Sequence, residues 1–216
     1  VKNSLETTLD TARAIASSTV KVRHIIFNDF STPETKMGLN ENQVAIGYEL
    51  IHLEEHTDHP SPNYKLVLQM AQKMANESNL PLLVIESDVV VKENTISDLL
   101  DFQKANSKSG LVGSVTVDEK GVVNFPYLKF KGVKEKVIDT SRSLSFCCTL
   151  FSTDFLKAYN FIGLDEAKDW YDTFISKKSI ELGFKNHVLM NAPVWHRPHA
   201  SRPWKQLKYS NPLKYY

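Results

Sequence analysis

The stretch Leu82-Leu83-Val84-Ile85-Glu86-Ser87-Asp88 decides how this sequence is interpreted. Four consecutive large aliphatic residues leave no polar face, which predicts a strand covered on both sides at the centre of a parallel sheet. The run ends at two carboxylates, and in open α/β sheets ligands bind at the carboxyl ends of the strands. Carboxylate oxygens suit Mg²⁺ or Mn²⁺, which commonly join one or two carboxylates to substrate phosphates. Taken alone, the run fits a strand that ends in a polar turn equally well.

Length and composition indicate one ordinary globular domain over residues 1–216. The 216 residues are enough for one sizeable core, and their 42% apolar and 24% charged content is typical of globular proteins. A formal net charge of +1 gives no support to a nucleic-acid partner. No stretch approaches the roughly 18 apolar residues of a membrane span, and no signal peptide is recognisable.

Two adjacent cysteines, Cys147 and Cys148, lie in an apolar segment. Neighbouring cysteines rarely bridge, because a disulfide between them strains the peptide. We therefore expect buried free thiols in a reducing cytoplasm, without a role as nucleophiles or metal ligands.

Helix and strand patterns alternate through the first half of the chain, which predicts a mostly parallel sheet with covering helices. In this half we expect a helix that begins after Asn3, strands over 22–27, 48–53 and 82–85, helices over 64–78 and 95–105, and loops over 30–45 and 54–62. In the second half we expect a hairpin of 111–117 with 122–123, a strand over 144–151, a helix over 170–183 and a strand over 187–190.

Two aspartates could carry chemistry. Asp29 follows the strand 22–27, where a carboxylate can accept hydrogen bonds from a ribose or a base, although an aspartate there also forms turns. Asp169 precedes the helix 170–183, with Asp165, Glu166 and Asp172 nearby. It could be the general base for an acceptor hydroxyl, and it fits a helix N-cap at least as well.

Late histidine and arginine residues extend the candidate site. A neutral imidazole of His196 could complete a metal site with Asp88, and Arg197 could contact a diphosphate. The alternative is a surface tail with incidental histidines. A second group, His52, His56 and His59, resembles metal ligands, but the neighbouring prolines favour a solvated loop.

Together these residues resemble family 2 glycosyltransferases of the GT-A fold over nearly the whole chain. The segment 25–32 resembles the "VVDDGSTD" segment, whose aspartate contacts the nucleotide, and Asp29 matches that aspartate. The segment 83–88 is similar to the strand and DxD motif that hold metal and diphosphate, here as an ExD variant. The segment 164–172 resembles the "FDE…ED" block, with Lys168 in place of a glutamate, and 194–196 matches a late metal-binding histidine. Residues 1–3 resemble the end of the family's first strand, so that most of this strand is missing from the chain.

The resemblance implies a GT-A-like fold, a mixed, mostly parallel sheet with helices on both faces. The nucleotide-binding half would cover about 1–110 and the acceptor-side half about 111–216. Asp169 matches the catalytic base. Asp88 and His196 would hold the metal. The residues implied in nucleotide-sugar binding are Asn3, Asp29, Lys65, Glu86, Ser87, Asp88 and Arg197.

The activity implied is metal-dependent, hexosyltransferase-type transfer with inversion, in bacterial polysaccharide or glycan synthesis. The donor would be a UDP-, GDP- or dTDP-sugar, the acceptor a glycan or lipid-linked hydroxyl, and the cofactor Mn²⁺ or Mg²⁺. We expect the protein in the cytoplasm, with peripheral association at the inner face of the membrane compatible with the sequence. A degenerate domain that binds nucleotide-sugar or a protein partner without catalysis is the alternative. A nucleotidyltransferase would need a Gly-rich, basic phosphate loop, which the sequence does not show.

Overall fold

The computed structural model describes residues 1–165 and 170–197. Its helices are α1 (Leu5–Ala16), α2 (Pro33–Ile46), α3 (Tyr64–Ser78), α4 (Thr95–Ala105), α5 (Thr153–Ala158) and α6 (Tyr171–Glu181), with 3₁₀ turns η1 (Leu53–Glu55), η2 (Leu128–Phe130) and η3 (Phe161–Gly163). The strands are β1 (Ile25–Asn28), β2 (Glu49–His52), β3 (Leu82–Ile85), β4 (Val89–Val90), β5 (Ser109–Val117), β6 (Val137–Asp139), β7 (Cys148–Phe151) and β8 (Lys185–His196).

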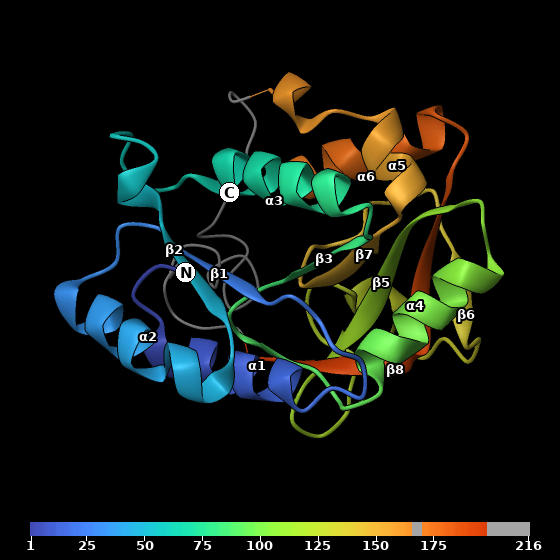
Figure 1. The fold of residues 1–216 in the computed structure, drawn as a ribbon. Coiled ribbons are helices and arrows are strands. Elements are labelled where there is room, and N and C mark those ends of the chain that lie inside the picture. The colour runs from blue at the N-terminus through green and yellow to red at the C-terminus, as the bar shows by residue number, and fades with distance from the viewer. Residues whose placement is uncertain (166–169, 198–216) are drawn as a thin grey trace, which may run out of the picture.

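The strands form two sheets (Figure 1). β1 and β2 pair in parallel, and a six-stranded sheet has the order β3-β7-β5-β8-β4, with β6 also paired to β8. In the larger sheet β5 and β8 run parallel to each other, and β3 points the same way because the intervening β7 is antiparallel to both β3 and β5. The short strands β4 and β6 run antiparallel to β8.

The position expected for β3 was wrong in one respect. β3 lies at the end of the hydrogen-bonded order of the six-stranded sheet, and its residues are only partly buried. The fully buried central strand is β5, whose sequence is SGLVGSVTV. Small residues are needed there because neighbouring elements approach closely: a Cβ on Gly110 would collide with Ser179 Oγ and would lie 2.8 Å from Phe184 Cβ. Leu111 and Val115 pack in one core cluster and Val112 in the other, and close packing explains the small residues between them.

Helices cover both faces of the larger sheet (Figure 1). On one face α3, α5 and α6 pack in a cluster that includes Leu68, Phe155 and Ile175, and on the other α1 and α4 pack in a cluster that includes Ile15 and Leu99. β3 contributes to both clusters from alternate residues, which is why its sequence is aliphatic throughout. The expected α/β fold, a mixed sheet between helix layers, is confirmed.

The loop expected over 30–45 was wrong, because most of it is helix α2. The segment lacks a continuous apolar stripe, so hydrophobic periodicity did not reveal it. Its ends carry the usual signals instead: Pro33 opens the first turn, Glu34 complements the helix dipole, and Gly47 ends the helix with φ 86°. α2 packs on α1 around the buried Leu39.

The remaining elements follow the sequence pattern with shifted ends. The helices over 64–78 and 95–105 are found as α3 and α4, and the turn after β5 brings Val123 back beside Val117. The strand expected over 144–151 is shorter, and the strand expected over 187–190 extends to His196 as β8. Among the described residues, none of the helices combines the length and apolar character needed to cross a membrane.

Candidate functional site

The acidic residues that follow β3 lie beside the end of β8. The two residues of β4 pair antiparallel with β8, with Val89 opposite His196, and the Arg197 amide donates a 2.9 Å hydrogen bond to the Asp88 carbonyl. This pairing brings Asp88 Oδ2 to 3.7 Å from His196 Nε2, and both residues are buried. The structure therefore brings together the two residues predicted as metal ligands, although they lie far apart in the sequence.

The His196 ring is oriented by its second nitrogen. Nδ1 lies 2.7 Å from the Phe125 carbonyl oxygen, which can only accept, so Nδ1 carries a proton. The Asn124 side-chain amide also holds the backbone, donating to the His196 carbonyl. In a neutral ring the Nε2 lone pair then faces the Asp88 carboxylate. Two acceptors that face each other at this distance are favoured by a cation between them, and this ring arrangement is usual for metal-binding histidines.

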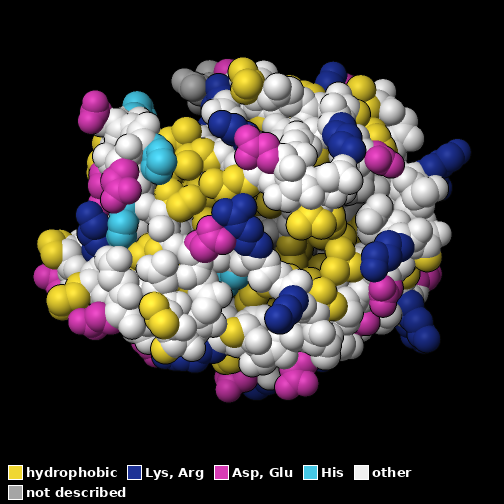
Figure 2. Space-filling view, in the orientation of Figure 1, with side chains coloured by type: hydrophobic (Ala, Val, Ile, Leu, Met, Phe, Trp, Pro, Cys, Tyr) yellow, Lys and Arg dark blue, Asp and Glu magenta, His cyan; other side chains and the backbone are white. Residues whose placement is uncertain are grey.

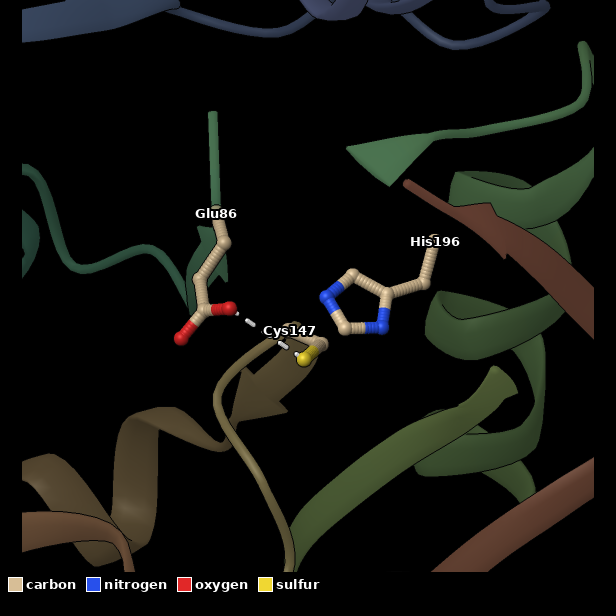
Figure 3. Close-up of side chains that lie close together, drawn as sticks. All are labelled: Glu86, Cys147 and His196. Carbon is tan, nitrogen blue, oxygen red and sulfur yellow. Dashed lines mark hydrogen bonds between the residues drawn. The ribbon is translucent and has the colours of Figure 1, made fainter. Parts of the chain in front are cut away.

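A cysteine completes the same cluster. Cys147 Sγ lies 3.3 Å from Glu86 Oε2, and one ligand atom from each of Glu86, Cys147 and His196 lies within 4.8 Å of the others (Figure 3). From the sequence we expected Cys147 to be a buried free thiol without a role as a ligand, because it lies in an apolar segment. The pairing of β3 with β7 was the missing information. Both cysteines are free and buried, as expected.

The cluster holds negative charge close together. Glu86 is exposed as a residue, but nearby protein atoms partly desolvate its carboxylate, and this desolvation, together with the charge of Asp88, raises the pKa of Glu86. Burial and then the Glu86 charge raise the pKa of the Cys147 thiol well above its usual range. A bound cation would relieve the repulsion between the carboxylates. Among the described residues, the donors therefore fit a divalent cation.

Asp29, at the end of β1, is held by the loop before α3. Its carboxylate accepts hydrogen bonds from the Ser61 hydroxyl (2.7 Å), the Asn63 amide (3.0 Å) and the Asn63 side chain (2.8 Å). Burial opposes ionisation, but these hydrogen bonds outweigh it and lower the pKa of Asp29. The side chain is half-buried, so it is ionised, oriented and still reachable from solvent.

The N-terminal segment connects the ends of β1 and β3. The Asp29 amide donates to the Val1 carbonyl, and the Asn3 side-chain oxygen accepts from the Thr32 amide. One residue further on, Ser4 Oγ lies 3.5 Å from Ser87 Oγ, next to the acidic residues. Asn3 therefore lies in a short segment that contacts Asp29 through Val1 and Ser87 through Ser4.

Lys65 and Arg197 differ in how they are held. Lys65 is the second residue of α3, two positions after Asn63, and so lies near the Asp29 loop. Arg197 forms a 2.8 Å ion pair with Asp10 of α1, and its guanidinium stacks over the Trp195 ring at 4.9 Å. A diphosphate would have to compete with Asp10 for this guanidinium.

The predicted base, Asp169, lies outside the described residues. Asp172, in the first turn of α6, is described, and its charge contributes to raising the pKa of Glu86 after burial and Asp88. Helix α6 therefore presents a carboxylate within electrostatic reach of the acidic cluster.

The second histidine group does not form one site. The His52 ring contacts the Asn28 and Asn40 side chains, and His59 Nδ1 lies 2.8 Å from the Pro60 carbonyl. His56 lines an open hollow of about 410 Å³ beside α3, on the face where Figure 2 shows apolar side chains gathered. None of the predicted site residues that the structure describes lines this hollow.

Comparison with known proteins gives a likeness in structure only. No model of a known protein family matches the sequence, and no curated protein does. Among solved structures, the mannosyltransferase PcManGT from Pyrobaculum calidifontis, in complex with GDP-Man and Mn²⁺, has a TM-score of 0.68 at 11% identity, over 95% of this chain and 57% of that chain. Residues 1–349 of S. aureus TarS have a TM-score of 0.68 at 16% identity, over 97% and 61%.

A third structure, GalNAc-T7 with UDP, GalNAc and Mn²⁺, has a TM-score of 0.56 at 13% identity, over 81% of this chain and 37% of that chain. The present chain thus spans less than two thirds of each of these three structures. At such low identity the likeness concerns the fold. It agrees with the mixed sheet and the two helix layers described above, and the protein therefore has a GT-A fold.

Proposed function

We propose that the protein is an inverting glycosyltransferase that moves a sugar from a nucleotide-sugar to an acceptor hydroxyl. The observation that supports it best is the cluster after β3, where Asp88 and Glu86 meet His196 at the edge of the sheet. In this fold that edge is where the resemblance puts the donor diphosphate. The neighbours solved with GDP-Man and Mn²⁺, or with UDP and Mn²⁺, agree with this proposal.

The chain's own residues would bind and orient the donor. Asp29, ionised and held by Ser61 and Asn63, would accept hydrogen bonds from the nucleoside. Asn3, Ser87 and Lys65 would line the same side. Asp88 and His196 would hold a divalent cation, which when bound would supply the positive charge that stabilises the departing diphosphate.

The acceptor oxygen would attack the anomeric carbon as the bond to the nucleoside diphosphate breaks, with inversion of configuration. A carboxylate must take the proton from the acceptor hydroxyl. We assign this role to Asp169, with Asp172, three residues further on, as the alternative because its charge acts on Glu86. Hexosyl transfer, a glycan or lipid-linked acceptor, bacterial polysaccharide synthesis and a cytoplasmic location at the membrane face belong to the same proposal.

The test of the donor site is nucleotide binding with and without a cation. Calorimetric titration with UDP, GDP and dTDP should show binding in Mn²⁺ that a chelator abolishes, because diphosphate and carboxylates repel each other. Asp88→Asn should weaken this binding more than Glu86→Gln. Equal binding with and without chelator would contradict the proposal.

The test of the base compares Asp169→Asn with Asp172→Asn, once a panel of nucleotide-sugars has identified a donor. Asparagine keeps the size and polarity of aspartate but cannot take the proton, so transfer should fall by about 10²–10⁴-fold while nucleotide binding stays. Asp154→Asn, in the first turn of α5 and exposed, is the matched control. Full activity of the Asp169 variant together with loss of activity in the Asp172 variant would assign the general base to Asp172. Nucleotide binding without transfer to any acceptor would favour the degenerate domain.

A further inference from the structure

Cys147 lies at a fixed place beside the acidic cluster. Ile85 pairs with Cys148 across β3 and β7, and the ladder continues one step further, where the Glu86 amide donates to the Cys147 carbonyl at 3.1 Å. The Cys147 thiol is buried on the side of Glu86, with Sγ 3.3 Å from Oε2. Backbone pairing therefore sets the distance between thiol and carboxylate.

His196 approaches the same point from β8. Its Nε2 is directed by the hydrogen bond of Nδ1 to Phe125, and the ligand atoms of His196, Cys147 and Glu86 lie within 4.8 Å of one another (Figure 3). Asp88 Oδ2 is 3.7 Å from the same imidazole. Bonds of 2.0–2.3 Å at tetrahedral angles leave ligand atoms about 3.3–3.8 Å apart, so small side-chain rotations would close the site.

We propose that Cys147 is a ligand in this cation site, and that the site therefore prefers a thiophilic divalent cation such as Zn²⁺ or Co²⁺ to Mg²⁺. Sulfur and imidazole ligands suit zinc and cobalt, whereas Mg²⁺ takes oxygen ligands in octahedral geometry. On binding, the metal–sulfur bond forms and the thiol proton leaves to solvent. The proposal refines the cation of the proposed function, but it concerns binding that needs no nucleotide.

The competing explanation is an ordinary hydrogen bond from the Cys147 thiol to Glu86, without metal. Cys148 separates the two explanations, because it is an equally buried thiol at the next position. Both thiols pack in the hydrophobic cluster that includes Ile15 and Leu99, but the ligand atoms grouped within 4.8 Å of one another are those of Cys147, Glu86 and His196, without Cys148. Of the two thiols, Cys147 is therefore the one placed to be a ligand with Glu86 and His196.

The experiment is a Co²⁺ titration of the metal-free protein, followed by near-ultraviolet absorption, where thiolate ligation produces a charge-transfer band. We expect this band in the unmodified protein and in Cys148→Ser, and its loss in Cys147→Ser, with Co²⁺ affinity at least about tenfold lower. Zn²⁺ at equimolar concentration should remove the band, and Mg²⁺ in large excess should not. Circular dichroism checks that both variants are folded.

Three results would overturn the proposal: no Co²⁺ binding, Co²⁺ binding without a thiolate band, or a band that Cys147→Ser leaves intact. Displacement of Co²⁺ by equimolar Mg²⁺ would overturn the stated preference. A Cys147-dependent band in a protein that binds no nucleoside diphosphate would instead end the glycosyltransferase proposal and leave the metal site in place.

Discussion

Replacing Asp29 by asparagine tests how the nucleotide side of the site is built. Among the described residues, its two carboxylate oxygens contact hydrogen-bond donors: Ser61 Oγ and the Asn63 backbone amide on one side, and the Asn63 side chain on the other. In either orientation, Asp29→Asn would place an NH₂ group against a donor. Hydrogen bonds to a charged group contribute about 1.5–3 kcal/mol each, and less where solvent competes. We therefore expect Asp29→Asn to lower the free energy of unfolding by about 1–3 kcal/mol. For a chain of this length that corresponds to a fall in Tm of roughly 3–9 °C.

The assay is thermal unfolding together with nucleoside diphosphate binding well below Tm. Asn63→Ala is the matched control, because it removes the hydrogen bond from the Asn63 side chain to Asp29, leaves the one from the Asn63 backbone amide, and keeps the charge of Asp29. If Asp29 contacts the nucleotide, Asp29→Asn should lose binding while Asn63→Ala retains most of it. An unchanged Tm in Asp29→Asn would refute the reasoning about the loop, and equal binding losses would refute direct contact.

The pH dependence has a definite sign. The pKa of Asp29 is lowered in the folded state, so its contribution to stability is present above the unfolded value of about 3.9 and is lost as pH falls through the folded value. The difference in stability between the unmodified protein and Asp29→Asn should therefore be constant near neutral pH and shrink below about pH 4. A difference that grows on acidification would contradict the assignment.

Two further variants test packing and charge. Gln72→Leu should destabilise the fold by about 2–4 kcal/mol in chemical denaturation, because the buried Gln72 side chain forms hydrogen bonds with three backbone groups and the Phe161 amide would lose its partner. Gln69→Leu is the control. It loses one hydrogen bond of 3.3 Å and should cost less than about 1 kcal/mol. In the presence of a chelator, Glu86→Gln should raise the Tm near neutral pH, because desolvation and the charge of Asp88 disfavour the ionised form of Glu86. This gain should vanish at low pH, where Glu86 is protonated. A lower Tm of the variant at about pH 7 would contradict the prediction.

The sequence predicted those parts of the fold that rest on apolar patterning. α3 and α4 have apolar stripes, and β3 is aliphatic because helices cover both its faces. α2 was missed because its sequence is polar and only its ends carry helix signals. The sequence predicted β3 rather than β5 as the central strand, because the small residues that allow close packing in β5 make its sequence less hydrophobic than that of β3.

The candidate site was predicted in part, for a different reason. Asp88 and His196 were predicted as partners from their ligand chemistry and again from the resemblance, and the structure brings them together. Cys147 could not be found in this way, because its proximity to Glu86 depends on the register of β3 with β7. Phe30 is a related case: it has φ 54° at the position where the resembling segment has glycine, so the backbone shape persists without the residue that signals it.

The pairing of β4 with β8 has a consequence for how the protein folds. Asp88 and His196 meet only after the chain between them has closed into one large loop, and loop closure of that length is slow compared with local helix formation. The helices and the β3 segment can form while the emerging chain is still incomplete, but the cation site cannot, because β8 is the last described strand. Acquisition of a cation should therefore be a late step that reports completed folding, measurable as a metal signal that lags behind the helical signal during refolding.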